Sequence, residues 1–487
     1  MSGPRLTPVA RPYSSVASAR VAAWLAVAVL AVVGGVAASW APTTYVLAFV
    51  ALMLVVALFL WRSQSPMVPF LLLAAAIPGG VLLQLSLGDA PIATLMPVFG
   101  GWALAAALLA REPNHLLLPA SDHGKHLPRS LVAFAMVVAL TAIAQNWRPA
   151  GHLPDISAVL TLVQLGILVC LAAYVLSSPQ RVMWVAYVTI AAGTAVAAVA
   201  LANQAGLLTI GTEMAYREGY TRVSGLEVDP NFFSFQLLVA LAFAIHVGLA
   251  TKRILGRVLV WSAFGVIFAG IVSSYSAGAL VGVAAVLGVT VLLQLRVSGK
   301  RALTVLVLIA VVTTVVAATA PAEYTDAVKA KYSGIADSSF EQLGTSRGAA
   351  WEAALRGIAS NPAVGAGLST STLQAAIADH YTLYRTEKRA AHNMYLGIAV
   401  GTGVFGLACF LVVLGSCLSV LWCTHGKATG GRQSETALAT ACLFTALVAA
   451  AAQGLQLDLQ FGKYLWLLIG ASLAVRHWPL CPCGVRG

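Results

Sequence analysis

A histidine and an asparagine, His392 and Asn393, stand directly before a long apolar stretch in the segment HNMYLGIAVGTGVFG. Imidazole exchanges protons near neutral pH, so a histidine in this position is a candidate general base. The dipole of a following helix disfavours a cation at its N-terminus, which predicts a neutral ring that accepts a proton. An interfacial histidine that hydrogen-bonds a loop carbonyl has the same sequence signature. Position alone does not separate the two interpretations.

Arginines mark two other polar segments of the chain. Arg222 lies in TRVSGLEVDPNFFS with Arg217 just upstream, and Arg347 lies in GTSRGAAW. A guanidinium group matches phosphate oxygens with two parallel hydrogen bonds, whereas a single interfacial arginine usually only anchors lipid headgroups. Because arginines on two segments accompany a histidine at an anion-favouring helix N-terminus, the set predicts a diphosphate site.

The acidic pair Glu227 and Asp229 allows several interpretations. Carboxylates near a diphosphate suit a metal-dependent glycosyltransferase. The pair also suits ion pairing with Arg217 or Arg222, or N-capping of a helix by Asp229 ahead of Pro230. We favour the structural roles.

Three further polar residues are candidate substrate contacts. Arg385 and Arg389, in YRTEKRAAHN, form either a solvated cationic stretch or a patch that docks an acceptor. Tyr275 belongs to a polar junction, SSYS, between two apolar stretches. No nucleotide-binding loop, dinucleotide fingerprint, HExxH motif or nucleophile elbow is present.

The composition defines the elements that must position these residues. Of 487 residues 59% are hydrophobic and only 9% are charged, and the mean hydropathy is +0.86. The apolar runs have the length of membrane-spanning helices and do not alternate, which predicts an all-α polytopic membrane protein with about 12–14 transmembrane helices. The expected spans are 21–40, 43–61, 67–88, 90–110, 130–146, 155–176, 182–203, 232–250, 257–273, 276–295, 302–320, 393–422, 436–452 and 461–475.

The distribution of charge predicts the orientation. The short loops RSQSP, TKRILGR, RVSGKR and THGKATGGRQSE are basic and alternate with loops almost free of lysine and arginine. The positive-inside rule therefore places the N-terminus inside and accounts for most of the net charge of +12 without a nucleic-acid partner. The expected domains are an inner tail (1–20), helices (21–320, with an outer segment 203–231), an outer loop (321–391), helices (392–475) and an inner tail (476–487).

The outer loop contains an amphipathic pattern in SRGAAWEAALRGIASNPAVGAG. Ser346 is the expected N-cap, and the helix is expected to end before Asn361-Pro362. Its apolar face is predicted to lie on the membrane surface or on the helical bundle. This face comprises Ala350, Trp351, Ala354, Leu355 and Ile358.

The stretch from Arg347 to Gly406 resembles the superfamily of bacterial O-antigen ligases and polymerases, and is closest to the ligases. His392-Asn393, nine residues, and then Gly403-Val404-Phe405-Gly406 matches the ligase pattern H-[NSQ]-x9-G-x-x-[GTV]. The upstream R…W…I…NP…G.G and the element RVSGLEVDPNF are also similar to family segments. One departure is Ala277, which stands where members often carry an arginine, so that one family phosphate contact is either missing or supplied by Arg217 or Arg222.

The resemblance implies an inverting, metal-independent glycosyltransferase of the GT-C type that uses no cofactor. Its donor would be an O-antigen glycan on undecaprenyl diphosphate, and its acceptor a lipid A-core sugar at the periplasmic face of the bacterial inner membrane. His392 would activate the acceptor hydroxyl, with Asn393 beside it, while Arg222, Arg347 and Arg217 would bind the diphosphate.

A polymerase that uses a second lipid-linked repeat unit as acceptor is the alternative. An R-x10-G pattern from Arg356 to Gly367 is of the kind linked with polymerases. A transporter of lipid-linked sugars would need charged residues within spans and internal repeats. The spans here are nearly free of charge and contain no repeat.

Overall fold

The computed structural model describes residues 66–78, 84–87, 90–94, 126–146, 156–208, 215–217, 220–227, 229–297, 299–319, 347–367, 391–430 and 434–478, with a few isolated positions between them. The predicted inner tail 1–20, the spans 21–40 and 43–61, and most of the outer loop lie outside these ranges.

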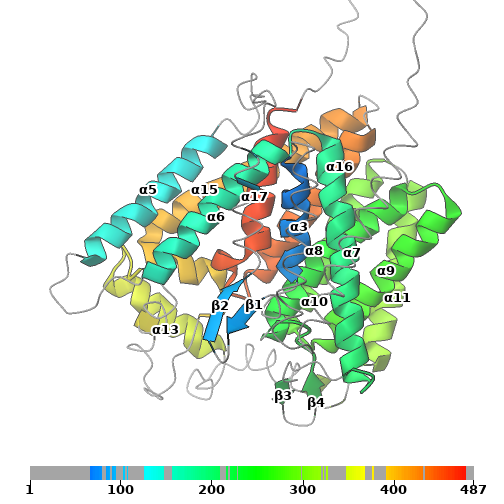
Figure 1. The fold of residues 1–487 in the computed structure, drawn as a ribbon, viewed down its shortest axis with the longest axis horizontal. Helices are drawn as coiled ribbons and strands as arrows, with labels where there is room; N and C mark the ends of the chain where they lie inside the picture. The colour runs from blue at the N-terminus through cyan, green and yellow to red at the C-terminus, as the bar shows by residue number, and fades with distance from the viewer. Residues whose placement is uncertain are drawn as a thin grey trace, which may run out of the picture.

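The described chain is a bundle of helices with two short hairpins (Figure 1). The helices are α3 (Met67–Ala76), α5 (Leu127–Asn146), α6 (Ile156–Val175), α7 (Pro179–Gln204), α8 (Pro230–Ala250), α9 (Ile254–Ser273), α10 (Ala277–Leu295), α11 (Gly299–Thr319), α13 (Arg347–Ser360), α15 (Met394–Gly430), α16 (Ser434–Gln453), the 3-10 helix η4 (Leu459–Phe461) and α17 (Lys463–Val475). The antiparallel hairpins are β1 (Gln84–Leu87) with β2 (Ala90–Thr94), and β3 (Ala215–Arg217) with β4 (Tyr220–Arg222).

The predicted helical membrane protein is confirmed. Six of the described helices, α7, α8, α9, α10, α15 and α16, are long and apolar enough to cross a membrane. From residue 127 onward each expected span coincides with a helix to within a few residues at most ends, although α15 extends eight residues beyond its expected end. Apolar length and the polar residues between runs thus locate the helices well.

One part of the span assignment is wrong. The expected spans 67–88 and 90–110 are interrupted, because α3 ends at Ala76 and residues 84–94 form the hairpin of β1 and β2. The sequence Gly88-Asp89 separates the two strands, and this dipeptide favours a tight turn over a continuous helix.

Helix α8 is the centre of the bundle. It contacts α7, α9, α10 and α16, and its side chains are buried on every face, including Phe233, Leu237 and Phe243. Such an all-round apolar helix is typical of a bundle core. Figure 1 shows α5 and α15 on one side of α8, and α7, α9 and α11 on the other.

The helix connections sort the ends of the bundle into two groups. The N-termini of α8, α10, α15 and α17 meet the C-termini of α9 and α16, and we call this the site end. The opposite end carries Lys252, Arg253, Arg257, Arg296, Lys300 and Lys427, and we call it the basic end. Both hairpins and α13 lie toward the site end (Figure 1).

Helix α15 is broken at Gly403, whose φ of 69° and ψ of −176° are not helical. A break leaves backbone groups without helical partners, and inside a bilayer these must be satisfied by protein. The segment 361–367 supplies the partners. Ala366 N donates to Val400 O (2.7 Å), and Gly367 N donates to Gly401 O (2.8 Å). Val404 N in turn donates to the carbonyl oxygen of Pro362 (2.8 Å).

The same contact explains two glycines of the motif. A Cβ on Gly403 would lie 2.4 Å from Ala363 O, and a Cβ on Gly365 would lie 2.4 Å from the carbonyl carbon of Gly401. Both glycines have positive φ angles, which side-chain-bearing residues rarely adopt. Segment 361–367, which we call the clip, therefore docks backbone against backbone.

Helix α13 leads into the clip and packs on the bundle. Packing on the bundle was one of the two predicted alternatives, the other being the membrane surface. Its buried residues Ala350, Ala353 and Ala354 form a cluster with Ala366 and Val400. Leu355 of the predicted apolar face does not pack on the bundle and is 57% exposed. Small alanines, rather than the larger Leu355, face α15 because the two backbones approach closely.

Candidate functional site

His392 lies outside the helix that it was predicted to start. Helix α15 begins at Met394, and His392 adopts a left-handed conformation with φ of 49°. Asn393 is the residue that caps the helix, because its Oδ1 accepts from Tyr395 N (3.0 Å) and Leu396 N (3.1 Å). Asn393 is buried, and its side-chain oxygen accepts the two hydrogen bonds of the cap.

Asp458 holds His392 in place. Its Oδ2 accepts from His392 N at 3.0 Å and its Oδ1 accepts from Asn393 N at 3.3 Å. The same Oδ2 lies 3.7 Å from Nδ1 of the imidazole, which is 45% exposed while the carboxylate is 17% exposed. The ring is therefore open to substrate on one side and faces a carboxylate on the other.

Asp458 is itself positioned by the turn that joins α16 to η4. Met394 N donates to Gly454 O (2.8 Å), which ties this turn to the start of α15. A Cβ on Gly397 would lie 3.0 Å from Gln460 Nε2 and 3.4 Å from Asp458 Oδ1. Helix α15 thus presents a bare glycine to Asp458 and Gln460, which leaves room for both side chains.

Arg222 is the centre of a second polar group at the same end of the bundle. Its Nε donates to Ser274 O (2.9 Å) and its guanidinium donates to Asn231 Oδ1 (3.1 Å). Ser276 Oγ donates to the same Oδ1 at 2.8 Å. These bonds hold the guanidinium beside the N-terminus of α10, where Ala277 is the first residue.

Only Asp229 of the acidic pair has the structural role that the sequence favoured. Asp229 caps α8, with its Oδ1 accepting from Asn231 N at 2.6 Å and Asn231 Nδ2 at 2.8 Å. The predicted pairing of Glu227 with Arg222 is not formed. Glu227 instead accepts a hydrogen bond from Gln236. Burial raises the pKa of Glu227, with opposing contributions from the Gln236 hydrogen bond and from Lys463.

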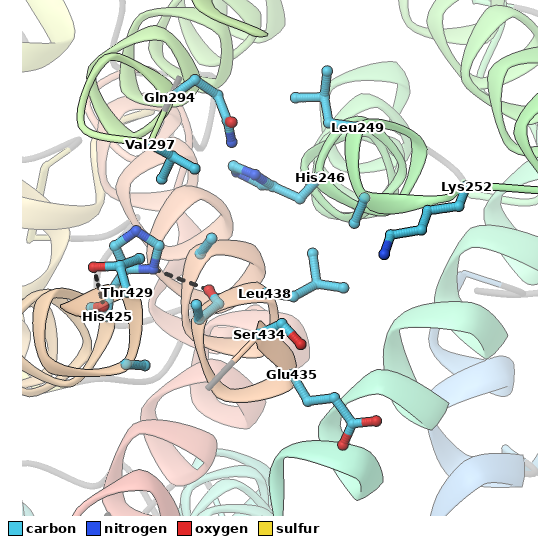
Figure 2. A pocket seen from close by; sticks show the side chains of 14 residues that line it. His246, Leu249, Lys252, Gln294, Val297, His425, Thr429, Ser434, Glu435 and Leu438 are labelled. Atoms are coloured by element: carbon cyan, nitrogen blue, oxygen red, sulfur yellow. Dashed lines mark hydrogen bonds between the residues drawn. The ribbon is translucent and has the colours of Figure 1, made fainter. Parts of the chain in front are cut away.

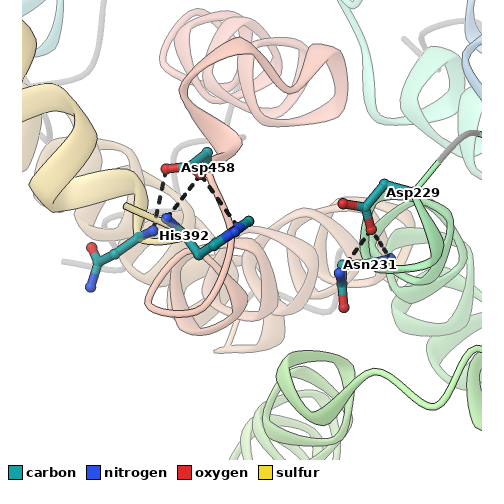
Figure 3. Close-up of polar contacts among 5 residues, drawn as sticks. Asp229, Asn231, His392 and Asp458 are labelled. Carbon is teal, nitrogen blue, oxygen red and sulfur yellow. Dashed lines mark hydrogen bonds and ion pairs between the residues drawn. The ribbon is translucent and has the colours of Figure 1, made fainter. Parts of the chain in front are cut away.

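The end of α16 connects the two polar groups. Gln453 Nε2 donates to Asn231 O (3.3 Å), and a Cβ on Gly278 of α10 would lie 3.0 Å from Gln456 Cβ. The chain then runs on to Asp458. Figure 3 shows the two groups in one view, with His392 at Asp458 and Asn231 at Asp229. A histidine and an arginine thus lie at the same end of the bundle.

Other predicted site residues are described only in part. Arg347 is the first residue of α13 and Arg217 ends β3, but their side chains lie outside the described residues. Arg385 and Arg389 lie outside them altogether. Tyr275 is half-buried in the turn between α9 and α10, with φ of 46°.

The R-x10-G pattern linked with polymerases has a structural explanation. Arg356 is exposed and forms an ion pair with Glu352 one turn earlier on α13. Gly367 belongs to the clip, where its N–H bonds to Gly401 O. The two residues of the pattern thus make separate contacts in the described structure.

Two residues that hold the candidate side chains, Asp458 and Asn231, were given no role in the prediction from sequence. Asp458 is 66 positions from His392, and a lone aspartate in a short loop carries no spacing signal. Asn231 follows the capping Asp229-Pro230. Its signal was its place in RVSGLEVDPNF, the element that contains Arg222.

Comparison with known families identifies one domain. Residues 262–411 match the family model described as O-antigen ligase. The match supports a place in the O-antigen ligase superfamily and runs from α9 through the clip, His392 and the break in α15. A search of curated proteins found no match.

Proposed function

We propose that this protein transfers an O-antigen glycan from undecaprenyl diphosphate to a lipid A-core sugar. The family match supports a glycosyltransferase of the O-antigen ligase or polymerase type. The observation that carries the proposal is the pairing of His392 with Asp458, at the end of the bundle where Arg222 is also held.

In the proposed reaction His392 acts as the general base. It takes the proton from the acceptor hydroxyl as that oxygen forms a bond to the anomeric carbon of the donor. The bond from this carbon to the diphosphate breaks, and the configuration inverts. Asp458 stabilises the positive charge that the ring gains, as a carboxylate does for a catalytic histidine elsewhere.

Arg222 is the proposed partner of the leaving diphosphate. Its hydrogen bonds to Ser274 O and Asn231 Oδ1 fix the guanidinium in one orientation, which is how a preorganised cation stabilises charge that develops in the transition state. Its position beside Ala277 suits it to replace the family arginine that is absent there. Arg347 and Arg217 are proposed as further phosphate contacts, and Arg385, Arg389 and Tyr275 as acceptor contacts.

The proposed location follows from the basic end of the bundle. By the positive-inside rule this end faces the cytoplasm, so that His392 faces the periplasm. The protein is then a multi-pass inner-membrane enzyme whose partners are two lipid-linked glycans and the surrounding lipids.

The test is transfer in vitro from an undecaprenyl-diphosphate glycan to purified lipid A-core, with and without EDTA. We expect one glycosylated product, no effect of EDTA, and no product from folded His392→Ala. The matched control is His477→Ala, at the basic end after α17, which is expected to retain activity.

Two results would decide against the proposal. Growing ladders from the donor alone, with lipid A-core ignored, would identify a polymerase. Transfer at the wild-type rate by folded His392→Ala would show that His392 is not the general base.

A further inference from the structure

A second site lies at the basic end of the bundle, at the opposite end of α8 and α15 from His392. A cavity of about 530 Å³ opens there between the ends of α8, α10, α15 and α16. Its polar lining includes His246, Lys252, Gln294, His425 and Glu435. Figure 2 shows Gln294 and His246 extending toward one another from opposite walls. None of these residues takes part in the proposed transfer.

Two buried side chains of the lining have an atom without a hydrogen-bond partner among the described residues. His425 is 5% exposed, and its Nδ1 lies 3.0 Å from Ala437 O. A carbonyl only accepts, so Nδ1 carries the hydrogen and Nε2 of the neutral ring is an acceptor. Nε2 has no partner, and neither has Oε1 of Gln294, which is 8% exposed. Buried acceptors are normally satisfied, so both atoms call for a donor.

A cation lines the same cavity. Lys252 follows α8, and Figure 2 shows its amine directed toward the cavity. Among the described residues no carboxylate lies within ion-pair distance of Lys252, and Glu435 lines another wall. Nearby, Arg296 stacks over Trp422 at 4.0 Å. A ligand that fits therefore has a negative charge and separate hydrogen-bond donors.

The apolar rim indicates where this ligand comes from. Leu292 and Leu295, which flank Gln294 on α10, are 47% and 60% exposed, and Val297, which lines the cavity, is 46% exposed. In a membrane protein these side chains face acyl chains. An exposed apolar side chain at the end of α10, Val297, thus forms part of the cavity lining.

We propose that this cavity binds the headgroup of an anionic phospholipid with free hydroxyls, of the phosphatidylglycerol kind. The phosphate lies against Lys252, and the glycerol hydroxyls donate to Gln294 Oε1 and His425 Nε2. The acyl chains lie along the exposed end of α10.

The test is native mass spectrometry of the full-length protein in detergent, titrated with phosphatidylglycerol, phosphatidylethanolamine or phosphatidylcholine of matched chains. Lys252→Met removes the charge, and we expect about fivefold weaker phosphatidylglycerol binding, since one lysine near an anionic lipid contributes about this much. Gln294→Leu removes one acceptor, and a similar loss is expected. Lys300→Met is the matched control, because Lys300 is basic, lies at the same end and does not line the cavity.

Melting temperatures without added lipid separate binding from folding. Gln294→Leu removes a buried atom that lacks a partner, so the lipid-free protein is expected to be at least as stable as wild type. Equal binding of the three lipids by wild type, or equal losses in Lys252→Met and Lys300→Met, would overturn the proposal. Displacement of the lipid by equimolar sn-glycerol 3-phosphate would also overturn it, by identifying a soluble ligand.

Discussion

Replacing Asp458 by asparagine tests the proposed mechanism most directly. The carboxylate lies 3.7 Å from Nδ1 of His392, and the two side chains are 17% and 45% exposed. Two unit charges at this distance interact by about 4 kcal/mol at an effective dielectric constant of about 20 and by about 1 kcal/mol in bulk water. For a half-exposed imidazole an intermediate value of about 2 kcal/mol is appropriate.

This energy is available only when the ring carries the proton, which in the proposed reaction is in the transition state. Asp458→Asn is therefore expected to lower kcat for glycan transfer roughly 30-fold, with a smaller change in KM. The amide also offers one acceptor oxygen where the carboxylate offers two, so His392 N or Asn393 N loses its bond. The expected loss of stability is about 1 kcal/mol.

The assay is transfer of a labelled glycan to lipid A-core, followed on gels under saturating and limiting acceptor. Glu352→Gln is the control, because this carboxylate pairs with Arg356 on exposed α13. If folded Asp458→Asn transfers glycan within twofold of wild type, the carboxylate does not support a proton on His392.

The remaining predictions concern the break in α15, the arginine and the buried carboxyl. Gly403→Ala is expected to lower the free energy of unfolding by about 2–4 kcal/mol, because of the left-handed φ and the clash with the clip. Gly415→Ala is the control, since an added Cβ there has nothing within 4 Å, and thermal unfolding is expected to show it neutral or slightly stabilising. Arg222→Lys is expected to reduce transfer about tenfold or more, because lysine lacks the fork that bonds both Ser274 O and diphosphate; unchanged kcat/KM would refute this. Burial raises the pKa of Glu227 above its unfolded value, so the folded state binds this proton more tightly, and stability falls as pH rises from the unfolded toward the folded pKa. Glu227→Gln is expected to remove this part of the pH dependence of Tm, and an identical pH profile would contradict it.

Most of the helices were predictable from the sequence, for physical reasons. A helix in a bilayer satisfies its own backbone, so apolar length and flanking polar residues locate it without knowledge of its neighbours. Pro230 after Asp229 also located a helix start, because a capping side chain and a fixed φ act locally. The hairpin at 84–94 was missed because strands and helices of short apolar runs look alike.

The candidate site was predictable only where a residue has a signal in its own local sequence. His392 and Arg222 were found because each precedes an apolar run. Asp458 was not predicted, because its contact with His392 forms only on folding, between the residues before α15 and the turn after α16. The break at Gly403 was also hidden, since a glycine in an apolar run is common and only the docked clip gives it a reason.

The clip also has a consequence for how the chain enters the membrane. Val400 O and Gly401 O accept from residues 366 and 367, which precede them in the chain and leave the ribosome first. If the clip were still on the wrong side when α15 inserts, two carbonyls and one N–H at the break would enter lipid without partners, at several kcal/mol each. In the proposed orientation, segment 361–367 must therefore cross the membrane before α15 is complete. An arrest peptide placed to stop synthesis just after Gly430 should report a pulling force that disappears when residues 361–367 are deleted.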